Sequence, residues 1–304
     1  MDRVYAGGDA LCLHNAATGR EQTMAHRIEP SQTKKKVVVV GGGPAGMEAA
    51  RVAASRGHQV TLFEAADKLG GQVLLAARAG WRKDMIGIVD WLASEVDYLG
   101  VTLRLGVFAE SEDILAETPD VVIVATGGGP NIDLMQNGEE LADNAWDLLT
   151  GQVQPALNIM IYDEGGGHSG TSLADWLSAI GKTVELVSPD RHTGRLLGGQ
   201  NYPVYLHNLY ERGATLTPNH RLVGVRREGN RLIALLRNEY SRETLEREVD
   251  QVVVDQGTSP VDDVYQALVA GSRNLGELDV EAMVEGCSQP DTANSLGHYQ
   301  LFRV

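Results

Sequence analysis

Hydrophobic residues in this chain come in short runs separated by glycine-containing turns. The run from 37 to 40 is all valine, which is typical of a parallel strand buried on both faces. Glycines and an alanine-rich stretch follow, and we expect that helix to end at Gly57, because glycine tolerates the left-handed conformation of a helix C-cap. Residues 59–63 supply a second strand. The segment therefore predicts a strand-helix-strand (βαβ) unit.

The same pattern returns later in the chain. Without a gap, the stretch from Gly41 to Glu64 (GGGPAGMEAARVAASRGHQVTLFE) aligns with the stretch from Gly165 to Ser188 (GGGHSGTSLADWLSAIGKTVELVS). The glycines at 41, 42, 43, 46 and 57 fall on glycines at 165, 166, 167, 170 and 181. A repeated βαβ unit with a glycine-rich turn indicates two nucleotide-sized sites.

Short strands surround the second unit. Residues 221–227, 231–237 and 249–255 predict a β-meander. Residues 120–129 and 250–259 each place a hydrophobic strand before a glycine-containing turn, and we expect the chain to cross between domains there. The predicted fold class is α/β, with two Rossmann-like dinucleotide-binding domains built on parallel sheets, a β-meander, and the second domain inserted in the first.

The first glycine cluster has the chemistry of a diphosphate site. Gly41 allows the tight turn, Gly43 lets the backbone approach a pyrophosphate, and Gly46 lets the helix pack against the strand. The helix N-terminus offers free backbone N–H groups to the phosphates. Glu64, at the end of the second strand, can accept hydrogen bonds from ribose hydroxyls. The candidate residues of this site are Gly41, Gly43, Pro44, Ala45, Gly46, Glu64 and Ala65.

Two further motifs favour FAD over NAD at this site. The stretch from Glu64 to Gln72 resembles the acid-to-paired-glycine segment of flavoproteins with two dinucleotide domains, and Ala125-Thr126-Gly127 resembles their ATG motif. Arg82 resembles a family position near the flavin, with a surface arginine as the alternative. These resemblances add Gly71, Gln72, Arg82, Ala125, Thr126 and Gly127 to the candidates.

The second glycine cluster predicts a different site. Asp163 and Glu164 precede it, and like charges near a pyrophosphate repel. Ser188 stands where the first unit has Glu64, which removes the acceptor that favours NAD. Three basic residues follow, which indicates NADPH if a nicotinamide cofactor binds at all, or else a solvated basic loop: Arg191, His192 and Arg195. The candidates are Gly165, Gly167, Gly170 and Ser188, for NAD(P)H or ADP.

Composition excludes several classes of function. The net charge of −15 argues against nucleic acid, because binding there needs excess lysine and arginine. There is neither an apolar run of about 18 residues nor a signal peptide's apolar centre, so we expect a cytoplasmic protein without a membrane partner. Cys12 and Cys287 form no CxxC, which argues against electron transfer through a closely spaced dithiol.

The string DALCLHNAATGRE, from Asp9 to Glu21, together with the flavin motifs, resembles the C-terminal half of the iron-sulfur flavoproteins related to trimethylamine dehydrogenase and 2,4-dienoyl-CoA reductase. The N-methylproline demethylase branch of this NADH:flavin oxidoreductase family is the most similar. The resemblance implies an upstream TIM barrel that carries FMN and substrate, and a 4Fe-4S cluster on four cysteines, of which Cys12 matches the last. It also implies a fragment, because three of those cysteines and a flavin-contacting Gly-Asp pair lie outside the 304 residues.

We therefore expect a linker at 1–33, an FAD-binding domain at 34–150 and 250–304, and an NAD(P)H- or ADP-binding-type domain at 151–249. The predicted function is the FAD-binding electron-transfer portion of an iron-sulfur flavoprotein oxidoreductase, which works with NAD(P)H or an electron carrier. The alternatives are a self-standing NAD(P)H-dependent flavin reductase and a non-catalytic module that holds ADP as a structural ligand. No catalytic residue is assigned, because the flavin itself carries the electrons.

Overall fold

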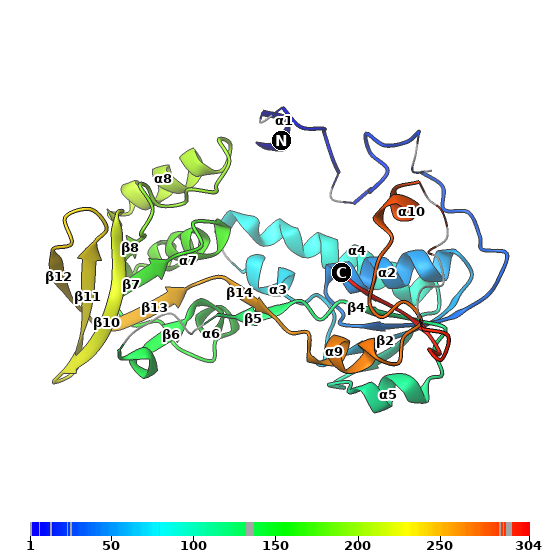
Figure 1. The fold of residues 1–304 in the computed structure, drawn as a ribbon. Helices are drawn as coiled ribbons and strands as arrows, with labels where there is room; N and C mark the ends of the chain where they lie inside the picture. The colour runs from blue at the N-terminus through cyan, green and yellow to red at the C-terminus, as the bar shows by residue number, and fades with distance from the viewer. Residues whose placement is uncertain are drawn as a thin grey trace. The chain divides into compact units, whose positions relative to one another are not determined.

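The computed structural model describes residues 2–5, 7–12, 14–22, 24, 26–78, 80–131, 137–285, 287, 289 and 294–304. Contacts between Cα atoms divide the chain into two compact units. The first unit comprises residues 3–74, 85–128 and 260–304, and the second comprises residues 75–84 and 129–259 with the first two residues of the chain. Figure 1 shows the elements of both units along the chain.

The first unit is built on a five-stranded sheet in the order β15-β4-β1-β2-β3, and every neighbouring pair of strands is parallel. Helices cover both faces of this sheet, α2 and α4 on one side and α5 and α9 on the other (Figure 1). Its strands are β1 (Lys36–Val40), β2 (Gln59–Glu64), β3 (Thr102–Leu105), β4 (Val121–Val124) and β15 (Gln300–Arg303). Its helices are α2 (Pro44–Ser55), α4 (Ile86–Tyr98), α5 (Ser111–Ala116), α9 (Asp263–Val269) and α10 (Val280–Val284).

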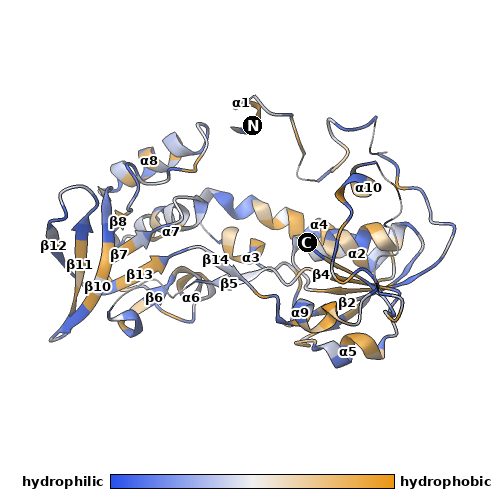
Figure 2. Ribbon diagram, viewed as in Figure 1, coloured by the Kyte–Doolittle hydropathy of each residue, from blue (hydrophilic) through white to orange (hydrophobic). Residues whose placement is uncertain are grey.

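The valine run of β1 explains why this sheet is covered on both faces. Val37 and Val39 pack with α2 and α4, whereas Val38 and Val40 pack with α5 and α9. Successive side chains of a strand point to opposite faces, so a strand with no polar position requires two apolar covers. The covering helices carry hydrophilic residues as well (Figure 2), and in α5 the buried residue is Ile114.

The second unit repeats this plan with a different cover. Its sheet has the order β6-β13-β7-β8-β9, again parallel throughout. Helices α6 and α7 pack on one face, and an antiparallel meander packs on the other. The strands are β6 (Ala142–Asn144), β7 (Asn158–Asp163), β8 (Thr183–Val187), β9 (Thr215–Thr217) and β13 (Gln251–Asp255), with the meander β10 (His220–Glu228), β11 (Arg231–Asn238) and β12 (Thr244–Val249). The helices are α6 (Ala145–Thr150), α7 (His168–Ala179) and α8 (Tyr202–Glu211).

Short elements complete the chain. Strands β5 (Gly128–Pro130) and β14 (Thr258–Pro260) form a two-stranded sheet where the chain passes between the units. The remaining short helices are α1 (Asp2–Tyr5), α3 (Val73–Ala76) and two 3₁₀ turns, Gly80–Met85 and Glu139–Leu141. Between 7 and 35, the described residues form no helix or strand, in line with the predicted linker. Among the described residues, no helix has both the length and the apolar character needed to cross a bilayer.

The structure confirms the predicted fold class, two parallel α/β units with a meander. One strand assignment is wrong. The predicted third meander strand, 249–255, is the central parallel strand β13, and the meander is completed by β12. Every residue of β13 is buried, whereas β12 alternates with exposed positions. For the same reason the second unit begins near 129 and extends to 259, where we expected 151–249.

Candidate functional site

The first glycine turn leaves no room for side chains at two of its glycines. The Gly41 N–H donates to Phe63 O at 2.8 Å, and Gly41 has a φ of +105°. A Cβ on Gly41 would lie 2.3 Å from Ala125 O, and a Cβ on Gly46 would lie 1.9 Å from Gly41 O. These approaches hold the ends of β1 and β4 and the start of α2 together, as the glycine spacing predicts.

Gly43 differs from those two glycines because the space beside it is open. It is the N-cap of α2 and provides no side-chain hydrogen bond to the first turn of the helix, and Pro44 follows. The nearest atom to a Cβ on Gly43 would be Gly71 Cα, at 4.0 Å. A helix N-terminus has unsatisfied backbone N–H groups and attracts anions. The turn therefore fits a diphosphate that lies against Gly43, Ala45 and Gly46.

Glu64 is held by the backbone at the end of β2. Its Oε2 accepts from Gly42 N at 2.6 Å, and its Oε1 accepts from Ala66 N at 2.7 Å. Each carboxylate oxygen has two lone pairs, so both can accept a further hydrogen bond. Glu64 and Ala65 also line a cavity at this edge of the sheet. The residue is thus placed where the sequence predicts a ribose-binding acid.

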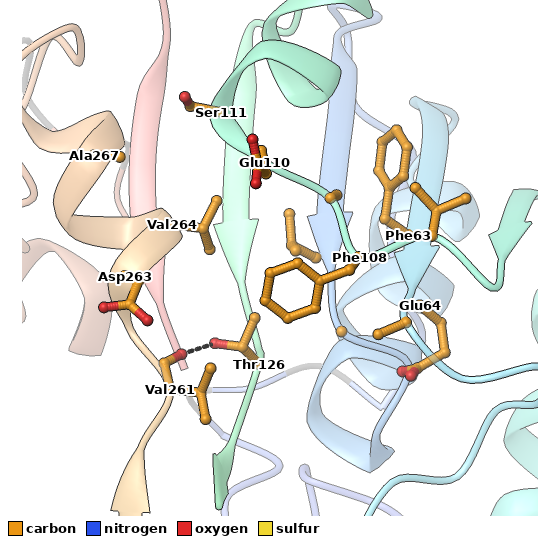
Figure 3. A pocket seen from close by; sticks show the side chains of 15 residues that line it. Phe63, Glu64, Phe108, Glu110, Ser111, Thr126, Val261, Asp263, Val264 and Ala267 are labelled. Atoms are coloured by element: carbon orange, nitrogen blue, oxygen red, sulfur yellow. Dashed lines mark hydrogen bonds between the residues drawn. The ribbon is translucent and has the colours of Figure 1, made fainter.

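The cavity measures about 380 Å³ and lies at the carboxyl ends of β1, β2 and β4 (Figure 3). Ligands of open α/β sheets bind at such ends. Its lining is mainly apolar and is completed by the loop after β3 and the start of α9. The lining residues are Val40, Gly41, Phe63, Glu64, Ala65, Val107, Phe108, Ala109, Glu110, Ser111, Thr126, Val261, Asp263, Val264 and Ala267.

Sequence reasoning missed Phe108 and Val264, which supply apolar walls of this cavity (Figure 3). Phe108 is 73% exposed although its ring lines an apolar pocket. One signal could have found it, because Phe108 follows the third strand of the sheet at its carboxyl end, where ligand pockets of this fold lie. Val264 belongs to α9, and no motif announces it.

The paired glycines meet the first turn directly. Gly70 N donates to Gly42 O at 2.8 Å. Gly71 has a φ of +51°, and a Cβ there would lie 3.0 Å from Gly43 Cα. Two motifs far apart in the sequence therefore form one backbone surface around the open space beside Gly43.

The Ala-Thr-Gly segment also returns to this site. Thr126 Oγ1 donates a short hydrogen bond to Val261 O (Figure 3), and Val261 N donates to Gly127 O at 3.0 Å. Gln72 Nε2 donates to Gly128 O at 3.1 Å. The structure thus brings Gly71, Gln72, Ala125, Thr126 and Gly127 around the first glycine turn.

Arg82 clusters with the second unit instead. It lies beside Tyr205, where burial raises the pKa of the hydroxyl and the Arg82 charge opposes that rise. Tyr205 also contacts Trp81, with ring centroids 5.4 Å apart, and accepts or donates a hydrogen bond with His168 Nδ1 at 3.2 Å. A flavin contact for Arg82 therefore stays a prediction.

The second glycine turn is organised around a buried carboxyl group. Gly166 N donates to Asp163 Oδ1 at 2.8 Å. A Cβ on Gly170 would lie 2.7 Å from Asp163 Cβ and Cγ, so this glycine makes room for the aspartate. The segment after β8 covers the turn, because Leu196 N donates to Gly166 O at 2.8 Å and a Cβ on Gly166 would lie 2.9 Å from Asp190 Oδ2. Gly165 and Gly167 have more space around them.

The charges around this turn are paired, which changes two expectations. Glu164 forms an ion pair with Arg221 of the meander, so it does not add an uncompensated negative charge. Arg195, expected to reach a 2′-phosphate, pairs with Asp190 at 2.8 Å. Ser188 is fully buried, and its N–H donates to a backbone oxygen of β9 at 3.1 Å.

Cys12 is exposed in the N-terminal segment. In the part of the chain that the structure describes, no group of three or more histidine, cysteine or acidic side chains is arranged to hold a metal. Near Cys12 in sequence, His14 contacts Trp91 of α4 edge-on, with ring centroids 6.0 Å apart. The cysteine therefore lies on a segment that is anchored to the first unit.

Two parallel α/β units, each with a glycine turn between its first strand and first helix, and the first with a terminal acid and an adjoining apolar cavity, define a dinucleotide-dependent flavoprotein oxidoreductase. Comparison with known proteins agrees. The family model for pyridine nucleotide-disulphide oxidoreductases matches residues 4–144.

A probable N-methylproline demethylase of Rhizobium meliloti (strain 1021) is 45% identical over 304 residues, which is all of this chain and 45% of that protein. An N,N-dimethylglycine/sarcosine dehydrogenase of Chromohalobacter salexigens is 46% identical over 302 residues, covering 96% of this chain and 44% of its own length. A 2-naphthoyl-CoA reductase structure has a TM-score of 0.81 at 25% identity, covering 99% of this chain and 41% of that one. The chain belongs to these FAD-dependent oxidoreductases, and it spans about 45% of the length of the curated relatives it matches.

Proposed function

We propose that this chain is the FAD-binding electron-transfer portion of an iron-sulfur flavoprotein oxidoreductase of the amine demethylase, amine dehydrogenase or enoate reductase type. The observation that carries the proposal is the open space beside Gly43, which a single Cβ would begin to fill. Bound FAD supplies the redox chemistry, and the protein supplies binding and orientation. The larger relatives, which this chain covers in part, support an additional substrate-binding region in the intact enzyme.

The first unit divides the binding of FAD among three kinds of group. The N-terminus of α2 takes the diphosphate next to Gly43, and Glu64 accepts from the adenosine ribose. The apolar cavity takes the adenine, and Phe108 covers one face of the base. An aromatic ring that is 73% exposed while lining an apolar cavity gains buried area when a base stacks on it.

Cys12 is proposed as one ligand of a 4Fe-4S cluster. Its exposure leaves the thiol free to meet ligands from another segment. The described residues provide no complete ligand group, so this chain alone does not fit a cluster. FMN likewise belongs to the upstream TIM barrel that the resemblance implies.

One observation favours the structural alternative for the second unit. The segment containing Asp190 and Leu196 covers the second glycine turn, and a covered turn supports a non-catalytic nucleotide site more than a turnover site. We therefore infer that external NAD(P)H is not the obligatory reductant of this chain. Adding NADPH or NADH to the FAD-loaded chain tests this inference, and rapid loss of flavin absorbance would favour the self-standing reductase.

FAD titration of the apoprotein tests the main proposal. Gly43→Ala should fold normally and lower FAD affinity by about tenfold to a hundredfold, because the added methyl group takes up space that the diphosphate needs. Gly167→Ala is the matched control. It alters the corresponding glycine of the second turn, where a Cβ also meets nothing within 4 Å, and should leave FAD affinity unchanged. Folded wild-type protein that binds no FAD would contradict the proposal.

A further inference from the structure

Two aspartates end neighbouring strands of the second unit. Asp163 is the last residue of β7 and Asp255 the last of β13, and they are register partners in the parallel pair. Neighbouring strands lie about 4.8 Å apart, and register partners point to the same face of the sheet. Asp163 is 1% exposed and Asp255 is 8% exposed. Two carboxyl groups are therefore buried side by side.

Their hydrogen bonds follow the same pattern. Asp163 Oδ1 accepts from Gly166 N at 2.8 Å, and Asp255 Oδ1 accepts from Gly257 N at 3.4 Å. The other oxygen of each, Oδ2, is buried and has no hydrogen-bond partner among the described residues. Buried acceptors without a donor are costly, and adjacent carboxylates repel each other. A single proton turns one of the two acceptors into a donor for the other.

The surrounding charges do not neutralise this pair. Asp190, from the segment after β8, adds negative charge near Asp163, and its own ion-pair partner is Arg195. Glu164 is engaged by Arg221, which also binds Glu239 at 2.7 Å.

The neighbouring helix α7 packs against Asp163 through Gly170, and burial together with the Asp255 charge raises the pKa of Asp163 to about 7. In the first unit the corresponding register pair is apolar, Val39 with Ile123. Packing of this sheet position therefore does not require acids.

We propose that Asp163 and Asp255 share one proton, and that this proton fastens the second glycine turn. The shared proton lets Asp163 remain buried while its Oδ1 holds the Gly166 N–H. Loss of the proton leaves two adjacent negative charges, which weakens the hold of Asp163 on the turn and on the covering segment above it. The pair is thus a pH-sensitive latch of the second unit, independent of which nucleotide binds the first unit.

Carboxyl-carbon NMR of the full chain tests the sharing directly. One aspartate carboxyl of the second unit should titrate near pH 7, and the Gly166 amide signal should shift with the same midpoint. In Asp255→Asn the amide nitrogen donates permanently to Asp163, so that titration should move to a much lower pH. Asp97→Asn, at an exposed position of α4, is the control and should change neither signal. A wild-type spectrum in which every aspartate titrates below about pH 5 would overturn the proposal.

Stability gives a second readout. The Asp163 pKa is raised from 3.8 to about 7, so the folded chain binds an extra proton between those values and loses stability as pH rises through that window. Hydrogen exchange of β7 amides, corrected for intrinsic rates, should show opening that increases about tenfold per pH unit between pH 5 and 7. Asp163→Asn and Asp255→Asn should abolish this slope, and Asp97→Asn should keep it. Parallel slopes in all four proteins would refute the latch, and if Asp163→Asn fails to fold, Asp255→Asn and the wild-type spectrum still decide.

Discussion

Gly46→Ala tests how the first glycine turn is built. A Cβ at this position would lie 1.9 Å from Gly41 O, and Cβ atoms essentially never come within 3.0 Å of another such atom. The start of α2 or the turn must therefore move by about 1 Å. Gly41 cannot yield easily, because its N–H is bonded to Phe63 O and its own Cβ direction points at Ala125 O. Overpacking of this kind costs typically about 1–3 kcal/mol, and we expect about 3 kcal/mol here because the contact is with backbone.

Native-state hydrogen exchange of β1 amides measures this loss in the first unit, and FAD titration measures its effect on the site. Gly87→Ala in α4 is the matched control, because a Cβ there meets nothing within 4 Å. Alanine is favoured over glycine inside a helix, so this variant should gain about 0.5–1 kcal/mol. FAD affinity should fall more than tenfold in Gly46→Ala and stay unchanged in Gly87→Ala. Equal stability of the two variants, or wild-type FAD affinity in Gly46→Ala, would refute the packing argument.

Two further substitutions examine the cavity and the acid. Phe108→Ala should weaken FAD binding about tenfold, because a base that stacks on an aromatic ring gains about 1–3 kcal/mol, and Phe108→Trp should restore affinity in the same titration. Glu64→Gln should destabilise the first unit by about 1–3 kcal/mol, because an amide offers one acceptor to the two backbone N–H groups of Gly42 and Ala66; unchanged urea unfolding of this variant would contradict the role of both hydrogen bonds.

The sequence predicts the first turn well because its constraints are local. The glycine spacing, the valine strand and Glu64 all lie within one βαβ unit, so chain connectivity alone brings them together. The cavity wall is different. Phe108 comes from the loop after the third strand and Val264 from α9, and their positions depend on the strand order of the whole sheet.

The boundary of the second unit could not be placed from pattern for a related reason. Strand β12 ends at Val249 and β13 begins at Gln251, so one residue separates a meander strand from a central parallel strand. The hydrophobic run of β13 stands out in the sequence, and it drew the meander assignment to itself. Its parallel pairing with β6 and β7 follows only from tertiary structure.

The second turn shows how the same glycine spacing can produce a different site. Gly46 makes room for a backbone oxygen of Gly41, which leaves the space beside Gly43 open, whereas Gly170 makes room for the side chain of Asp163. From sequence, Asp163 and Glu164 count as two charges that repel a diphosphate. Adjacent residues at a strand end point in opposite directions, so one is buried against Gly170 and the other meets Arg221 of the meander. The electrostatic character of the turn is therefore set by residues that the repeat does not contain, and the two halves of one duplicated pattern have diverged in what they can bind.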